Sequence, residues 1–250
     1  MKIEITSDND LQNAQRYTEI ASRYRKDWRG ESSPDLVDKY QIFLEMLGKG
    51  KKRILDVGCG TGKASLFFSK LGHQVFSLDL SAGMLRETIN QKEDVCALDG
   101  TMANMKRFPF PSSSIDGLWT MAAVVHLPAQ DRKTAFGEFY RVVKQDGVLG
   151  LSVQNRLYPK HIQRIFQSCF FDIGYDNENQ YYQKRKDLPD IIHGFSIMRA
   201  LIEGYAFMDG RHWYFPMMSE LRSSLSEVGF SIKTLNSPLE RRIDIFAVKR

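Results

Sequence analysis

Apolar residues near the start of the chain recur at steps of three and four, the spacing of one face of an α-helix. The first series of such positions is Ala14, Tyr17, Ala21, Tyr24 and Trp28. A second series follows Ser33-Pro34 and consists of Leu36, Tyr40, Phe43 and Leu47. Residues 1–50 are therefore predicted to form two amphipathic helices that precede the first strand.

Short apolar runs of strand length then alternate with helical patterns. The predicted strands are 53–57, 74–80, 95–98, 115–121 and 148–153. The predicted helices are one that follows the glycines after residue 57, one over 81–90 with Ser81 as N-cap, and one over 130–144. Because consecutive strand–helix units require right-handed crossovers, we expect a parallel sheet with helices on both faces.

This alternation stops after Asn155. Residues 155–212 are predicted to be a cap insertion, rich in Phe, Tyr and His and with helical spacing around 191–202. A helix that ends at Gly229 and strands at 230–235 and 243–248 then complete the core. We expect one domain, made of N-terminal helices (1–50), a core (51–154), the cap insertion (155–212) and the C-terminal part of the core (213–250).

The composition is that of an ordinary globular protein, with 42% hydrophobic and 26% charged residues among 250. The N-terminus lacks the apolar segment of a secretory signal, and no stretch approaches the roughly 18 apolar residues of a membrane helix. These features predict a cytoplasmic protein with no membrane partner. Three scattered cysteines predict neither a disulfide framework nor a metal site. The net charge of +5 mildly favours anionic partners.

Three glycines mark the turn between the first core strand and its helix, in the segment Asp56-Val57-Gly58-Cys59-Gly60-Thr61-Gly62. Such a turn lets the backbone approach a ligand and directs helix N–H groups at it. A dinucleotide loop requires the spacing G-x-G-x-x-G, and here the third glycine comes one position early. A P-loop requires a first glycine where Val57 stands and Ser or Thr where Ala64 stands. The spacing excludes both.

An acid followed by three alternate glycines resembles the class I S-adenosylmethionine (SAM)-dependent methyltransferases of the small-molecule type. Two further segments are similar to motifs of this family. Phe108-Pro109-Phe110-Pro111 with Ser114-Ile115-Asp116 resembles LPFPDxSFD, and residues 139–147 resemble RVLKPGG, without its proline and one glycine. The resemblance covers residues 53–153, and more loosely 213–250. It implies a Rossmann-like, seven-stranded, mostly parallel α/β sheet whose last strand is antiparallel.

The resemblance also implies SAM as the cofactor. In that family the glycine loop holds the methionine and ribose moieties, a carboxylate such as Asp79 accepts the ribose hydroxyls, and an acid at the position assigned to Asp99 meets the adenine amino group. For Asp56 a structural role, bracing the loop, is the stronger interpretation, and Cys59 is interpreted as a small filler. The expected cofactor-binding residues are Asp56, Gly58, Cys59, Gly60, Gly62, Asp79, Leu80, Met84, Asp99, Gly100, Thr101 and Met121.

The residues that receive the methyl group are less clearly marked. His126 follows the fourth strand, where an acceptor approaches, and is the candidate general base, although a packing role is favoured. The candidate acceptor-binding residues are His126, His193, His212, Trp213 and Tyr214. Tyr17 and Tyr24 lie on a helix that in this family often folds over the cofactor. Since methyl transfer from a sulfonium is an in-line displacement, no catalytic dyad is required.

The favoured function is methyl transfer to an oxygen or nitrogen of a small molecule or a peptide. Amino-methylating DNA enzymes carry an Asn/Asp-Pro-Pro-Tyr/Phe motif where this chain has Thr120-Met121-Ala122-Ala123, so an exocyclic base amine is not expected. Two alternatives stay open, an RNA (tRNA) methyltransferase and a non-catalytic SAM-binding regulatory protein. The oligomeric state is not predicted.

Overall fold

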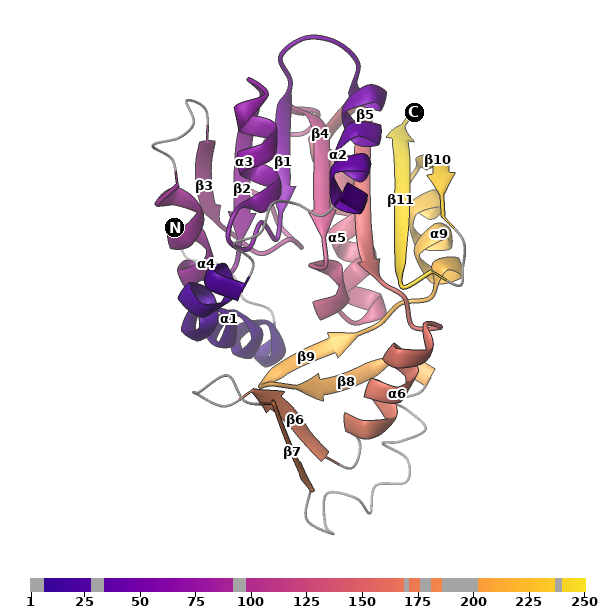
Figure 1. The fold of residues 1–250 in the computed structure, drawn as a ribbon. Coiled ribbons are helices and arrows are strands. Elements are labelled where there is room, and N and C mark those ends of the chain that lie inside the picture. Colours follow the sequence, from indigo (N-terminus) through magenta and orange to yellow (C-terminus); the bar gives the residue numbers. More distant parts are fainter. Residues whose placement is uncertain are drawn as a thin grey trace.

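The computed structural model describes residues 7–27, 34–91, 98–168, 171–175, 181–185, 202–236 and 240–250. Seven strands form one sheet in the order β10-β11-β5-β4-β1-β2-β3 (Figure 1). Their bounds are β1 Arg53–Val57, β2 Gln74–Asp79, β3 Leu98–Met102, β4 Ile115–Met121, β5 Val143–Gln154, β10 Phe230–Leu235 and β11 Arg242–Lys249. Strands β1 to β5 pair in parallel, and β11 is antiparallel to β5 and β10. The expected Rossmann-like sheet with an antiparallel last strand is confirmed.

Helices cover both faces of this sheet (Figure 1). On one face lie α2 (Pro34–Leu47) and α3 (Lys63–Lys70), whose Tyr40, Phe43 and Phe68 surround Trp119 of β4. On the other lie α5 (Ala129–Val142) and α9 (Met218–Glu227), which share a buried apolar cluster with the sheet. Burial of each large apolar side chain stabilises the fold by roughly 2 kcal/mol, so these two layers fix the strands and the loops at their ends.

Helices α1 (Asp8–Asp27) and α4 (Ala82–Ile89) pack against each other beside the carboxyl ends of the strands. Ile20 and Ala21 of α1 contact Met84 of α4. A Cβ at Gly83 would lie 2.7 Å from the Thr18 backbone, so the two helices approach as closely as glycine allows. The N-cap predicted for α4 is confirmed, because the Ser81 hydroxyl accepts from the Met84 N–H at 3.2 Å.

The described part of the insertion after β5 contains hairpins as well as a helix. The described residues form α6 (Pro159–Ser168) and two hairpins, which lie beyond the carboxyl edge of the sheet (Figure 1). The hairpins pair β6 (Phe171–Tyr175) with β7 (Tyr181–Arg185) and β8 (Tyr205–Met208) with β9 (Arg211–Tyr214). Asp209-Gly210, both with positive φ, forms the tight turn between β8 and β9. The boundary expected at residue 212 therefore falls inside a strand, and the helical spacing at 191–201 lies outside the described residues.

Candidate functional site

A cavity of about 1000 Å³ lies at the carboxyl edge of the sheet, where strand order reverses. From β1 the chain passes to β2 and β3 on one side, whereas β4 and β5 lie on the other, which is the usual ligand site in open α/β sheets. The β1–β3 half of the cavity is lined by residues of 56–91 and 103–105. The β4–β11 half is lined by Met121, Ala122, Ala123, His126, Leu127, Gln154, Arg211, Trp213, Arg241 and Arg242. Helix α1 lines both halves.

The glycine loop shapes the β1–β3 half. Gly58, Gly60 and Gly62 have φ of +67°, +56° and +85°, a region that favours glycine. A Cβ would lie 2.3 Å from the Ala123 Cβ at Gly58 and 2.7 Å from Thr88 Cγ2 at Gly62, but at Gly60 it would meet no atom within 4 Å. Gly58 and Gly62 are thus required by packing. The space beside Gly60 is open to a ligand.

Asp79 ends β2 beside this loop. Its carboxylate accepts the Gly60 N–H at 2.9 Å through Oδ2 and the Ser81 N–H at 2.9 Å through Oδ1. Burial raises the pKa of Asp79, and these backbone N–H groups oppose the rise. Because each carboxylate oxygen can accept two hydrogen bonds, Asp79 holds the loop and retains capacity to accept from a ligand.

Asp56 is buried at the end of β1 and faces α3 as well as the cavity. It accepts from the Ser65 hydroxyl at 2.6 Å, and the Ser77 hydroxyl donates to Ser65 at 2.7 Å. Burial raises the pKa of Asp56 to about 7. These contacts brace the first turn of α3 against the sheet and favour the structural interpretation. Cys59 is also buried, with Sγ 3.9 Å from the Thr88 hydroxyl, as a small filler would be.

The structure does not bring Asp99, Gly100 and Thr101 to the cavity. Of the predicted strand 95–98 only Leu98 lies within the described residues, and β3 runs from Leu98 to Met102. Asp99 pairs with Phe76, three positions before Met102 pairs with Asp79, so Asp99 lies within the strand and not at its carboxyl end. None of the three predicted residues lines the cavity. The register of β3 against β2, which no local pattern specifies, places them within the strand.

Ala103 and Asn104 occupy the position at the carboxyl end of β3 and line the cavity. Asn104 is buried, its Oδ1 accepts the Lys106 N–H at 3.0 Å, and its Nδ2 lies 3.4 Å from Asp10 of α1. The Lys106 ammonium bridges Asp10 and Asp131, at 2.7 Å from each. This ion-pair network ties α1 to the loop after β3, and sequence reasoning missed it because its members lie far apart in the chain.

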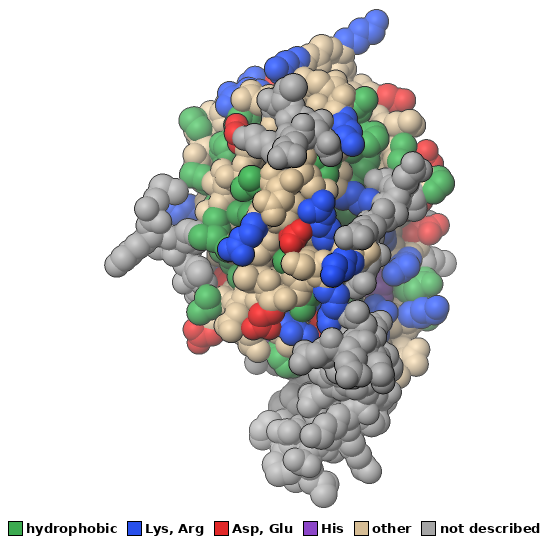
Figure 2. Space-filling model, turned by 60° about the vertical axis from the view of Figure 1, so that its left-hand side comes forward, with side chains coloured by type: hydrophobic (Ala, Val, Ile, Leu, Met, Phe, Trp, Pro, Cys, Tyr) green, Lys and Arg blue, Asp and Glu red, His purple; other side chains and the backbone are tan. Residues whose placement is uncertain are grey.

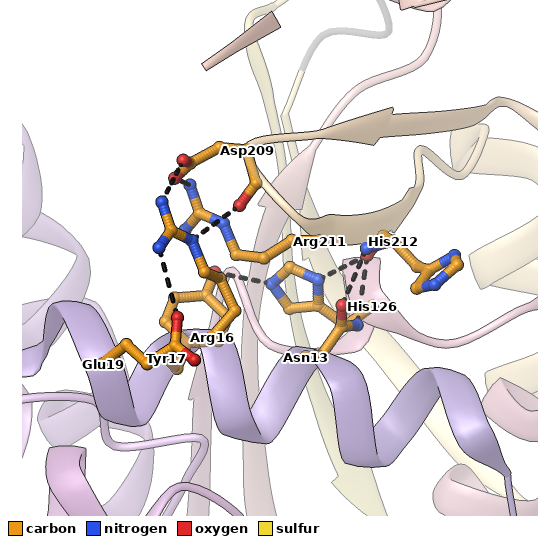
Figure 3. A network of polar contacts seen from close by, with 8 residues as sticks. All are labelled: Asn13, Arg16, Tyr17, Glu19, His126, Asp209, Arg211 and His212. Carbon is orange, nitrogen blue, oxygen red and sulfur yellow. Dashed lines mark hydrogen bonds and ion pairs between the residues drawn. The ribbon is translucent and has the colours of Figure 1, made fainter. Parts of the chain in front are cut away.

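His126 ends the 3₁₀ helix η2 (Val124–His126) in the β4–β11 half. Its Nδ1 lies 2.7 Å from the His212 carbonyl oxygen and its Nε2 lies 2.8 Å from the Tyr17 hydroxyl (Figure 3). Because a carbonyl only accepts, Nδ1 carries the proton and Nε2 accepts from Tyr17. Burial lowers the pKa of His126 to about 4, so the imidazole is neutral at pH 7.

Hydrogen bonds and an ion pair join helix α1 to the β8–β9 hairpin beside the cavity (Figure 3). The Asn13 side chain donates to the His212 carbonyl at 3.2 Å and accepts the His212 N–H at 2.7 Å. Arg16 forms an ion pair with Asp209 at 2.6 Å. These contacts join residues about 200 positions apart in the sequence and close this side of the cavity.

The predicted acceptor-binding residues do not all reach the cavity. His126 and Trp213 line it, with ring centroids 4.6 Å apart. The His212 ring contacts Tyr205 and Gln12, and Tyr214 is buried in packing, so neither side chain lines the cavity. His193 lies outside the described residues. The predicted cofactor residues Leu80, Met84 and Met121 all line the cavity.

Residues 55–151 match a family described as a methyltransferase domain. A malonyl-[acyl-carrier protein] O-methyltransferase of Methylovorus sp. is 36% identical over 165 residues, which cover 63% of this chain and 52% of that protein. A sterol 24-C-methyltransferase of Neurospora crassa is 25% identical over 242 residues, 86% of this chain and 58% of that protein. This chain contains a class I SAM-dependent methyltransferase domain.

Solved structures share the fold of this methyltransferase domain. A SAM-dependent methyltransferase from Mesorhizobium loti superposes with a TM-score of 0.64 at 17% identity, over 88% of this chain and 100% of that one. The [4+2]-cyclase SpnF superposes with the same TM-score at 14% identity, over 94% and 95%. The chain spans little more than half of the two curated relatives named above.

No described helix of the methyltransferase domain combines the length and apolar composition needed to cross a membrane. Within the described ranges, no group of three His, Cys, Asp or Glu side chains is placed to hold a metal ion.

Proposed function

We propose that this chain transfers the methyl group of SAM to an oxygen or nitrogen of a small-molecule acceptor. The observation that carries this proposal is one cavity with two unlike halves, at the switch point of a methyltransferase sheet. The β1–β3 half has an open glycine backbone and a carboxylate. The β4–β11 half has aromatic and basic side chains enclosed by α1 and β9.

The residues of the β1–β3 half fit SAM. A Cβ at Gly60 would occupy space that is otherwise open, which suits close approach of a ligand to the backbone. Asp79 would accept from the ribose hydroxyls, and the Asn104 side-chain carbonyl, in place of Asp99, would accept from the adenine amino group. Leu80, Met84 and Met121 would supply apolar contacts. When bound, SAM supplies a methyl group already activated by a sulfonium.

In the β4–β11 half we assign positioning, not proton abstraction, to His126. Its Nε2 already accepts from Tyr17, and an imidazole with a pKa of about 4 is a weak base. His126 would therefore orient the Tyr17 hydroxyl beside the acceptor. Orientation of the acceptor and exclusion of water by α1 can supply much of the acceleration of an in-line displacement.

Two facts bear on the acceptor. The relatives are named for malonyl-[acyl-carrier protein], sterols and, in a protein of Arabidopsis thaliana that is 26% identical over 196 residues, phosphoethanolamine. These names support a small or carrier-bound acceptor over RNA. A cyclase with the same fold means that the fold alone does not require methyl transfer, so turnover needs a direct test.

The test is release of S-adenosylhomocysteine (SAH) from SAM in the presence of small hydroxy, amino and thioester-linked acids, with mass detection of the methylated product. We expect SAH and product in equal amounts with at least one acceptor, and none with Asp79→Ala. Binding of SAM with no formation of SAH in the presence of any acceptor would favour the regulatory alternative. Activity with tRNA alone, falling steeply with salt, would favour the RNA enzyme.

A further inference from the structure

Acidic side chains are distributed unevenly along the cavity, whereas basic side chains line both halves. Its acidic lining residues are Asp10, Asp56 and Asp79, all on the β1–β3 half, since Asp10 lies against Asn104. The basic lining residues of the β4–β11 half are Arg211, Arg241 and Arg242. Among the described residues, no carboxylate lines that half.

Arg242, at the start of β11, has no ion pair with any described residue. Its Nε donates to the Ser152 hydroxyl at 2.8 Å and its Nη2 to the Ser152 carbonyl at 3.0 Å, both neutral groups. The nearby Asp244 is engaged elsewhere, with Lys39 at 3.1 Å and the Ser152 hydroxyl at 2.5 Å. Arg242 is partly buried, and burial lowers its pKa.

Arg211, on β9, shares the one acidic partner that it has among the described residues. Asp209 binds Arg211 at 2.9 Å and Arg16 at 2.6 Å, so one carboxylate serves two guanidinium groups. The Arg211 guanidinium lies 4.8 Å from the Tyr17 ring centroid and 5.2 Å from that of Trp213, which orients it beside the cavity.

Tyr24 of α1 lines the cavity together with both arginines. Burial raises the pKa of its phenol, and the charges of Arg211 and Arg242 oppose that rise. The positive charges of β9 and β11 therefore face the same cavity.

We propose that the β4–β11 half binds a methyl acceptor that carries a carboxylate or a phosphate, held by Arg211 and Arg242. A partly buried guanidinium, such as those of Arg211 and Arg242, gains most from an anion that accepts two of its N–H bonds at once. The inference rests on the proposed function only in assigning this half to the acceptor. The net charge of +5, with Lys and Arg side chains gathered across the middle of the face in Figure 2, would also favour the approach of an anion.

The experiment uses three probes with the same alkyl chain, which are hexanoate, hexyl phosphate and the neutral hexanamide. Binding is measured by calorimetry on the full chain, with and without saturating SAH. We expect hexanoate or hexyl phosphate to bind at least about ten-fold more tightly than hexanamide, and the tighter of the two identifies the anionic group. Equal affinity of all three probes would overturn the proposal.

Arg242→Gln should weaken binding of the preferred anion about ten-fold and leave the affinities for hexanamide and SAH unchanged. Arg222→Gln is the matched control, because Arg222 lies exposed on α9 away from the cavity and the substitution removes the same charge. Equal weakening by both substitutions would mean non-specific attraction and would also overturn the proposal. Circular dichroism and the melting temperature verify that each variant is folded. Arg211→Lys keeps the charge but loses the paired N–H donors of the guanidinium, and it should weaken binding of the anion less than Arg242→Gln does.

The two proposals fail separately. Loss of SAH binding by the wild type would contradict the proposed function, while the probes without SAH still report on the anion site. Normal SAH binding with no preference for either anion would contradict this inference alone.

Discussion

In the β1–β3 half of the cavity the ligand-facing groups come from the ends of three adjacent strands, whereas in the β4–β11 half they come from α1, η2, β9 and β11. The first half uses backbone conformation, as in the left-handed Gly58, Gly60 and Gly62. The second uses side chains brought together by tertiary contacts, such as Tyr17 with His126. Binding the cofactor is common to SAM-dependent methyltransferases and suits a site built from backbone conformation. Binding the acceptor differs between them and suits a site built from side chains.

The largest expected effect separates packing from ligand space within the glycine loop. Gly58→Ala should destabilise the protein by about 3 kcal/mol, because its Cβ would clash with Ala123 in addition to the strain of positive φ. Gly60→Ala should cost only about 1 kcal/mol, since no atom lies within 4 Å, yet it should weaken SAH binding about ten-fold. Urea denaturation and calorimetry measure the two. Equal stability losses would show that both glycines serve packing.

The two halves should respond to acid in opposite directions. His126, which faces Tyr17 of α1 and Arg211 and His212 of β9, has its pKa lowered from 6.5 to about 4, so its contribution is complete above pH 6.5 and is lost toward pH 4. Asp56, which faces Ser65 and Asp79, has its pKa raised from 3.8 to about 7, so its contribution is complete below pH 3.8 and is lost toward pH 7.

Each group should change the free energy of unfolding by about 2 kcal/mol between pH 7 and pH 5. In the wild type the two largely cancel. His126→Gln should become more stable relative to the wild type on acidification, and Asp56→Asn less stable, as measured by urea denaturation at both values. If both variants shift in the same direction, the assigned environments are wrong.

A smaller effect decides which residue occupies the adenine position. Asn104→Ala should weaken SAH binding about ten-fold, since it removes one hydrogen-bond acceptor just after the end of β3. Asp99→Ala, within β3, is the matched control and should leave SAH affinity unchanged, because Asp99 does not line the cavity. If calorimetry showed weaker SAH binding in Asp99→Ala than in Asn104→Ala, Asp99 would occupy the adenine position and β3 would end earlier.

The smallest expected effect concerns the contact between α1 and β9. Arg16→Ala should destabilise the protein by about 1 kcal/mol, because the Arg16–Asp209 pair is only partly exposed. Glu19→Ala, which removes the exposed partner of the same arginine, should have almost no effect. Hydrogen exchange should show faster exchange in α1 of Arg16→Ala only. Faster exchange spread evenly over the sheet would contradict a local anchor.

Much of the core was predictable because its signals are local. Strands 53–57, 115–121 and 230–235 were predicted with the bounds that the structure has, and Ser81 with its helix was predicted from capping chemistry. The β8–β9 hairpin also has a local signal, the Asp209-Gly210 turn, but the cap insertion was predicted from helical spacing and this turn was not used.

The rest depends on contacts between distant residues. The position of Asn104 follows from the register of β3 against β2, and the neutral state of His126 follows from Tyr17 and the His212 carbonyl, respectively 109 and 86 positions away. That Arg242 has no ion pair among the described residues follows from the engagement of Asp244 by Lys39. No pattern along the chain encodes these pairings, so the β4–β11 half emerged only in three dimensions.

The central claim, a SAM site in the β1–β3 half, is tested most directly by calorimetric titration of SAH and NAD into the wild type and Asp79→Ala, each verified as folded by its melting temperature. If this half holds SAM, SAH binds the wild type, NAD gives no binding, and Asp79→Ala weakens SAH binding about 100-fold, the loss expected for hydrogen bonds to a charged acceptor. Tight binding of NAD, or an unchanged affinity for SAH in Asp79→Ala, would contradict it.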